Sequence, residues 1–197
     1  MGKTRLEAFS DGVLAIIITI MVLELKVPHG ASPASLQPLI PVFLSYILSF
    51  VYLGIYWNNH HHMLHTVHEV SGGILWSNLH LLFWLSLVPF VTGWMGENHF
   101  AAAPTALYGL ILFMASLAFL ILQCAIIKKQ GPDSLLAQAI GKDIKGKISA
   151  ISYIIGIPVA FFSPMLAGSI YIFVALLWLI PDKRIEHALN AEHSRHT

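Results

Sequence analysis

A single carboxylate, Asp11, lies at the start of a strongly apolar stretch of this sequence. It follows Phe9 and Ser10, and the apolar run beyond it continues to residue 25, interrupted only by Thr19 and Glu24. A carboxylate at the centre of a membrane helix costs roughly 2.5–3.5 kcal/mol on insertion scales, so it normally faces protein or water. Asp11 therefore predicts an ion pathway or a polar contact between helices, unless it merely caps the start of a helix.

Five histidines form a second group of residues that could bind a metal ion or change charge with pH. His61 and His65 are four residues apart, and His68 follows three residues later. In a helix this spacing brings imidazoles onto one face, as zinc sites require, but Glu69 is the only acid nearby. We favour an interfacial segment in which histidine replaces lysine or arginine, with a metal site as the alternative, and expect activity that depends on pH. The group consists of His60, His61, His62, His65 and His68.

The elements that must position these groups are membrane helices. The 197 residues are 56% hydrophobic and only 11% charged, and the mean hydropathy is +0.72. A soluble domain of this size could not bury so much apolar surface. The apolar segments are continuous, whereas the strands of a membrane barrel would alternate, so we predict an all-α membrane protein.

We expect six helices, which form one transmembrane domain over residues 1–197. Pro158 and Pro164 break the last apolar stretch, so the fifth and sixth helices are short and are expected to form a tight hairpin. The predicted helices cover residues 6–25, 39–57, 73–94, 101–127, 148–162 and 165–180.

The basic residues set the orientation of these helices. Lysine and arginine gather on the cytoplasmic side of membrane proteins, and six crossings leave only Lys26 on the opposite side. We therefore predict a multi-pass protein of the cell membrane with both termini in the cytoplasm. The residues on the cytoplasmic side are Lys3, Arg5, Lys128, Lys129, Lys142, Lys145, Lys147, Lys183, Arg184 and Arg195.

Composition argues against several other classes of function. Cys124 is the only cysteine, which excludes an internal disulfide and a multi-cysteine metal site. The net charge is +1 and the lysines are confined to membrane edges, so the sequence indicates no basic surface for binding nucleic acid. The sequence shows no arrangement of nucleophile and base and no phosphate loop, so we expect neither an enzyme nor a bound cofactor.

Helical geometry divides the first predicted helix into two faces. At about 100° per residue, four residues share one stripe, whereas Ser10 and Asp11 point away from it. The stripe faces either lipid or an environment of its own, while Asp11 faces the other helices of the subunit. It consists of Ile16, Thr19, Ile20 and Leu23.

The start of this helix has a distinctive order of residues. Arg5 is followed after three residues by Phe9, Ser10 and Asp11, and then by the apolar run. This order resembles the first-helix signature of the prokaryotic relatives of transmembrane protein 175, the lysosomal potassium channel. The resemblance implies a channel that conducts potassium ions.

Two further stretches are similar to the same family. Residues 56–61 resemble its Trp-Xaa-Xaa-His-His motif, and residues 81–83 with 86–90 resemble its third helix. His80 and Trp84 depart from the usual pattern, in which apolar or smaller residues are common. The resemblance extends over the first three predicted helices.

The resemblance implies a homotetramer in the lipid bilayer, with the first helix of each subunit lining a central pore. Carried over by position, the apolar constriction falls on Ile16, with Ile20 and Leu23 further along and Thr19 supplying a hydroxyl layer. Such a hydrophobic gate closes by dewetting, and a hydrated ion loses part of its shell there. Modest selectivity for potassium is expected, because potassium sheds water more readily than sodium.

The resemblance also implies structural roles for the signature residues. Ser10 and Asp11 are expected to hydrogen-bond helices two and three, whereas Arg5 has either a pore-mouth role or only a topological one. Their candidate partners are Trp57, His60, His61, Trp76, Asn78 and His80.

Two alternatives from other classes remain open on sequence grounds. A proton-coupled secondary transporter could use Asp11, Glu24 and the histidines as a relay. A metal- or haem-binding membrane protein could be built on the histidine cluster at residues 60–68.

Overall fold

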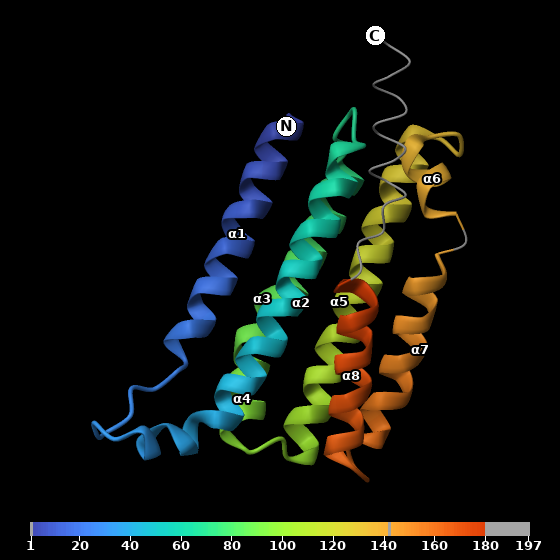
Figure 1. The fold of residues 1–197 in the computed structure, drawn as a ribbon. Coiled ribbons are helices and arrows are strands. Elements are labelled where there is room, and N and C mark those ends of the chain that lie inside the picture. Colours follow the sequence, from blue (N-terminus) through green and yellow to red (C-terminus); the bar gives the residue numbers. More distant parts are fainter. Residues whose placement is uncertain (1, 142, 180–197) are drawn as a thin grey trace.

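The computed structural model describes residues 2–141 and 143–179, and this part of the chain is helical apart from connecting turns (Figure 1). The predicted all-α class is thereby confirmed for these residues. The elements are α1 (Lys3–Leu23), η1 (Pro33–Leu39), α2 (Ile40–His65), α3 (Gly72–Ser86), α4 (Val88–Glu97), α5 (Ala102–Gln130), α6 (Leu135–Ile140), α7 (Ile144–Val159) and α8 (Pro164–Leu179).

Four helical stretches among the described residues are long and apolar enough to cross a membrane. They are Lys3–Leu23, Pro33–His65, Gly72–Glu97 and Ala102–Gln130. The second combines η1 with α2, and the third combines α3 with α4. The protein is therefore embedded in a membrane.

The last two helices are shorter. α7 and α8 each contain 16 residues, or about 24 Å of helix, against a hydrocarbon core of about 30 Å. The chain turns back between Val159 and Pro164, and the two helices pack against each other (Figure 1). The proline-flanked stretch thus forms a helical hairpin.

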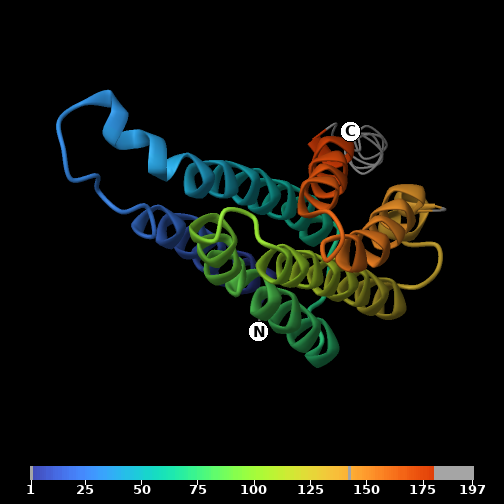
Figure 2. The same cartoon turned by 90° about the horizontal axis from the view of Figure 1, so that it is seen from below.

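α5 occupies the middle of the bundle, where it packs against α3, α4, α7 and α8. α1 packs against α2, α3 and α4 on one side, and the α7–α8 hairpin lies on the other (Figures 1 and 2). One face of α1 is therefore held by three helices. Its opposite face meets no described element.

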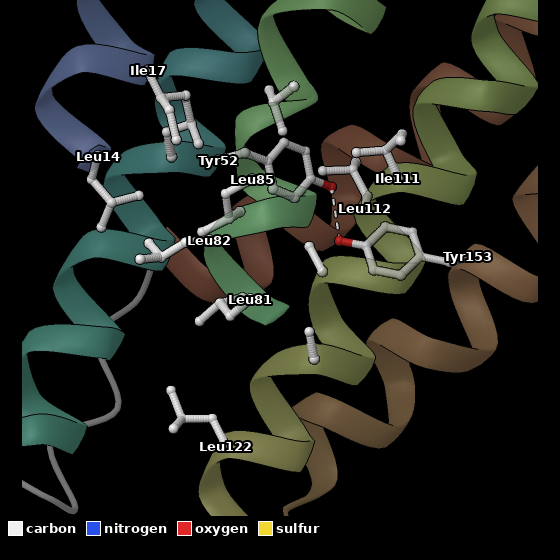
Figure 3. Packing of buried hydrophobic residues seen from close by; sticks show 14 of the residues in the cluster. Leu14, Ile17, Tyr52, Leu81, Leu82, Leu85, Ile111, Leu112, Leu122 and Tyr153 are labelled. Carbon is white, nitrogen blue, oxygen red and sulfur yellow. Dashed lines mark hydrogen bonds between the residues drawn. The ribbon is translucent and has the colours of Figure 1, made fainter. Parts of the chain in front are cut away.

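The core joins α1 to α3 through apolar side chains. Leu14 and Ile17 of α1 are buried in one cluster with Leu81, Leu82 and Leu85 of α3 (Figure 3). The buried residues of α1 repeat every three or four positions, which is the period that places side chains on one face of a helix. This apolar contact fixes how α1 is rotated about its own axis.

Tyrosines form the polar part of the core. The hydroxyl of Tyr153 donates to that of Tyr52 at 3.4 Å (Figure 3), and the Tyr52 hydroxyl donates to the carbonyl of Tyr171 at 2.5 Å. Tyr171 lies against Gly109 and Gly156, where an added Cβ would overlap its ring or hydroxyl. These glycines allow α5 and α7 to approach α8 closely.

The helix bounds differ from the predicted ones most clearly in the second and third predicted helices. α2 extends to His65, eight residues beyond the predicted end at residue 57, because a helix can continue past the apolar part of its sequence. The third predicted helix, residues 73–94, contains a break at Leu87. Pro89 follows in the first turn of α4, where its missing N–H is tolerated.

Basic residues gather at one end of the bundle, here called the basic end, where α1 and α7 begin and α2 and α5 finish. Lys3 Nζ donates to the carbonyl of His65 at 2.7 Å, and Gln130 Nε2 donates to that of Thr66 at 2.8 Å. These bonds hold the three helix ends together. The basic residues described at this end are Lys3, Arg5, Lys128, Lys129, Lys145 and Lys147.

The opposite end carries Lys26, which pairs with Glu97 at the end of α4. The hydrogen bond and the negative charge of Glu97 raise the pKa of Lys26 above its usual value. The remaining basic residues of the topology prediction lie outside the described residues, as does the end of the predicted helix 165–180. They are Lys142, Lys183, Arg184 and Arg195.

Candidate functional site

The stripe predicted on the first helix is exposed along its whole length. Ile16 is 58% exposed, Ile20 42% and Leu23 79%, and Thr19 lies between them on the same uncovered face. The opposite face, which includes Leu14 and the other core residues of α1, is buried. α1 therefore has one side packed against the protomer and one apolar side that faces outward.

Thr19 adds a polar atom to this apolar stripe. Its hydroxyl donates to the carbonyls of Ala15 at 3.0 Å and Ile16 at 2.9 Å. Because the proton is used within the helix, the lone pairs of the oxygen remain available to a cation. The exposed stripe thus presents isoleucine and leucine side chains with a single layer of oxygen.

Asp11 faces α2. Trp57 Nε1 donates to Asp11 Oδ1 at 3.0 Å, so one of the six candidate partners reaches the carboxylate. Helix α1 begins at Lys3 with Gly2 as its N-cap, which places Asp11 in the third turn. The capping interpretation is therefore wrong, and the carboxylate instead joins two helices.

Ser10 anchors α1 to α3 and, through it, to α2. Asn78 Nδ2 donates to Ser10 Oγ at 3.0 Å, and His60 Nε2 lies 2.7 Å from Asn78 Oδ1. Because the amide oxygen can only accept, His60 donates from Nε2. All three side chains are buried. The amide of Asn78 therefore bridges a hydroxyl on α1 and an imidazole on α2.

The other candidate partners lie elsewhere. Trp76 is 75% exposed, and His80 accepts a hydrogen bond from Trp84 Nε1 at 2.9 Å on its own helix. The two residues that depart from the family pattern thus contact each other. His61 stacks on Trp57, with ring centroids 5.9 Å apart and planes at 26°.

The remaining residues of the signature lie at the exposed surface. Arg5 is exposed on the first turns of α1, at the basic end. Phe9 is 48% exposed and falls on the same side of the helix as the exposed stripe. Neither side chain belongs to the polar contacts behind α1.

The histidine cluster divides between two environments. His60 is buried in the anchoring contact, whereas His61 packs edge to face on His65 with centroids 4.4 Å apart. His68 follows the end of α2 and is exposed. Residues 2–141 and 143–179 contain no group of three or more histidine, cysteine or acidic side chains placed to hold a metal ion. His60 hydrogen-bonds Asn78, and His61 makes aromatic contacts with Trp57 and His65.

A groove of about 630 Å³ lies beside the exposed stripe, between α1 and α4. Ile16 and Ile20 line one wall, and Phe90 and Trp94 line the other. The two rings stack on each other with centroids 6.4 Å apart. Sequence reasoning missed this wall, although two aromatic residues four positions apart on an apolar helix were a usable signal.

We predict that Trp57→Phe destabilises the protein by about 1 kcal/mol, below the usual value for a charged acceptor because the Asp11 pair is partly exposed. Phenylalanine keeps the stack on His61 but cannot donate to the carboxylate. Chemical unfolding of the purified protein in detergent measures the change. Trp76→Phe is the matched control and should stay within about 0.5 kcal/mol. Equal effects of the two substitutions would remove the role assigned to the Asp11 contact.

Comparison with known proteins identifies similar chains. Residues 5–89 match the family described as "Endosomal/lysosomal potassium channel TMEM175". A potassium channel of Chryseobacterium sp. (strain P1-3) is 61% identical over 190 residues, covering 96% of this chain and 99% of that one. The human endosomal/lysosomal proton channel TMEM175 is 35% identical over 83 residues, or 36% of this chain and 16% of the human protein.

A solved structure has the same fold. The crystal structure of a lysosomal potassium-selective channel TMEM175 homolog from Chamaesiphon minutus matches with a TM-score of 0.79 and 27% sequence identity. The match covers 91% of this chain and 97% of that one. The similarity therefore extends beyond the signature helix to almost the whole chain.

Proposed function

Since this chain belongs to the TMEM175 family, whose members are ion channels and not enzymes, we propose that it forms a homotetrameric potassium channel with α1 lining the pore. The observation that carries this proposal is the exposed stripe of α1. Three large apolar side chains and one hydroxyl lie uncovered on a helix whose other side is anchored in the protomer. Neighbouring copies that share an axis would bring four such stripes together.

The groove beside α1 supports this assembly. Its open face carries Phe90 and Trp94, which are 64% and 38% exposed, and aromatic side chains are enriched where subunits meet. A neighbouring α1 that packs against Phe90 and Trp94 would cover these rings and the side of the stripe that lines the groove, while the outward side of the stripe would face the axis. The anchoring contacts of Asp11 and Ser10 would then hold each pore helix from behind.

The stripe also provides a mechanism for gating and selectivity. Rings of Ile16, Ile20 and Leu23 form apolar collars that exclude water when narrow and conduct when widened. An ion that passes them loses part of its hydration shell, which favours potassium over sodium because potassium is dehydrated more easily. The oxygen layer at Thr19 replaces some of the lost water.

The orientation follows from the basic end. Lysine and arginine favour the cytoplasmic side of the membrane, so the start of α1 is proposed to lie in the cytoplasm of the cell. Six crossings, with α7 and α8 as the last two, place both termini there. Lys26 and Glu97 then lie on the outer side.

Recording from purified protein in planar bilayers under a potassium gradient tests the function. We expect unitary currents far above the turnover of any carrier, with a reversal potential that follows the potassium gradient. A flux without resolvable unitary currents would favour the transporter alternative. A reversal potential that follows a pH gradient would instead assign proton conduction, as in the name of the human relative.

We predict that the current depends on pH through the histidine cluster, because His61 packs on Trp57, whose indole N–H holds Asp11 of the pore helix, and on His65. The double variant His61→Gln/His65→Gln is expected to lose this response, whereas His99→Gln, at the far end, keeps it. A response that persists in the double variant would refute this role.

A further inference from the structure

A second pocket, of about 400 Å³, lies between α2, α5 and α7, away from the exposed stripe. Its lining along α5 extends over residues 113–127, or about 21 Å of helix. Tyr52 and Tyr153 lie at its deep end, and Asp143 and Lys147 line it at the basic end. The pocket is therefore elongated, apolar along most of its length and charged at one end.

Gln123 gives this apolar pocket a polar group that could bind a ligand. Its side chain is only 9% exposed and lines the pocket, and no described residue hydrogen-bonds to it. Across the pocket, Asn59 donates its amide to the carbonyl of Ile55 at 2.8 Å, which leaves its side-chain oxygen as an acceptor. The middle of the pocket thus offers hydrogen bonds that the chain itself does not use.

The charged end carries groups of both signs. Lys147 is exposed, and it follows one helical turn after Asp143, whose Oδ1 accepts from the backbone N–H of Gly146 at 3.1 Å. Nearby, Trp178 Nε1 donates to Ser149 Oγ at 2.8 Å, and Lys145 lies over the Trp178 ring. A lysine and a carboxylate side by side match the phosphate and the ammonium of a zwitterionic headgroup.

We propose that this pocket binds one phospholipid per chain. One acyl chain lies along α5, an ester carbonyl accepts a hydrogen bond from Gln123, and the phosphate pairs with Lys147. Asp143 favours a headgroup that carries an ammonium over one that is only anionic. This site lies apart from the contacts that anchor the pore helix. Asn59 of α2 lines the lipid pocket, whereas the next residue, His60, contacts Asn78 of α3.

Cys124, the only cysteine of the chain, lines the same pocket and is exposed. The rate of its alkylation by N-ethylmaleimide therefore reports whether the pocket is occupied. The full chain is purified in detergent, depleted of lipid and mixed with phosphatidylethanolamine. At ten times the dissociation constant, occupancy slows alkylation by about tenfold. Phosphatidylglycerol is expected to protect less, and diacylglycerol, which lacks the phosphate, hardly at all.

Two variants make the test specific. Lys147→Ala and Gln123→Leu should lose most of the protection by phosphatidylethanolamine, whereas Lys128→Ala, an exposed lysine outside the pocket, should keep it. Equal protection in all variants, equal protection by diacylglycerol, or no protection would each overturn the proposal. Protection without added lipid that disappears when residues 180–197 are removed would assign the pocket to the chain's own C-terminal segment.

Discussion

Ile16→Asn is expected to produce a channel that leaks. In the proposed pore, an amide in the collar of Ile16 would keep water in the constriction, so the closed pore would no longer dewet. Each 1.36 kcal/mol removed from the barrier raises the rate about tenfold, and we expect at least this increase in current at rest. Discrimination between potassium and sodium should fall as well, because ions then pass with more of their hydration shell.

The control for this substitution is Ile154→Asn on α7. Ile154 and Ile16 are both 58% exposed, so the two changes place the same polar group on equally uncovered apolar positions. Planar bilayer recordings of the two variants are compared at equal protein amounts. A leak in both variants, or in neither, would mean that Ile16 does not form the constriction.

Asn78→Leu is expected to destabilise the protein by about 3 kcal/mol, because it leaves two buried partners without their hydrogen bonds. His60 loses its acceptor, and Ser10 loses its donor, while the volume at the site is nearly kept. α1 is then held by apolar contacts, the Asp11 pair and the hydrogen bond from Lys3 to His65. We therefore expect a lower unfolding temperature and a smaller fraction of assembled channel in size-exclusion chromatography.

Asn98→Leu is the matched control for Asn78→Leu. Asn98 is exposed and donates to the carbonyl of Trp94 at 2.8 Å at the end of α4, so its loss should cost about 0.5 kcal/mol. Ser10→Ala should fall between the two, since it removes only one end of the bridge. If Asn78→Leu and Asn98→Leu cost the same, the buried contact does not anchor α1.

The two faces of α1 were accessible to sequence reasoning because helical periodicity alone separates them. Leu14 and Ile17 had to lie off the stripe of Ile16, Thr19, Ile20 and Leu23, whatever the tertiary structure. The exposed positions of Ile16 and Leu23 agree with that division. Periodicity separates the two faces but does not determine what the exposed face contacts.

The partners of the signature residues were only partly accessible. Trp57 and Asn78 are among the six candidates and do reach α1, whereas Trp76 and His80 do not. The choice depends on how α3 is rotated, which follows from packing against α5 and not from local sequence. The groove beside α1 depends on how α4 packs against α1, which the local sequence does not determine.

The central claim is that the exposed stripe of α1 faces conducted ions. The most direct test measures potassium current through Thr19→Cys in a Cys124→Ser background, before and after a positively charged, water-soluble methanethiosulfonate. We expect modification to stop nearly all of the current, while Ile154→Cys, modified to the same extent, continues to conduct. Complete modification of Thr19→Cys, verified by mass, with unchanged current would contradict the account.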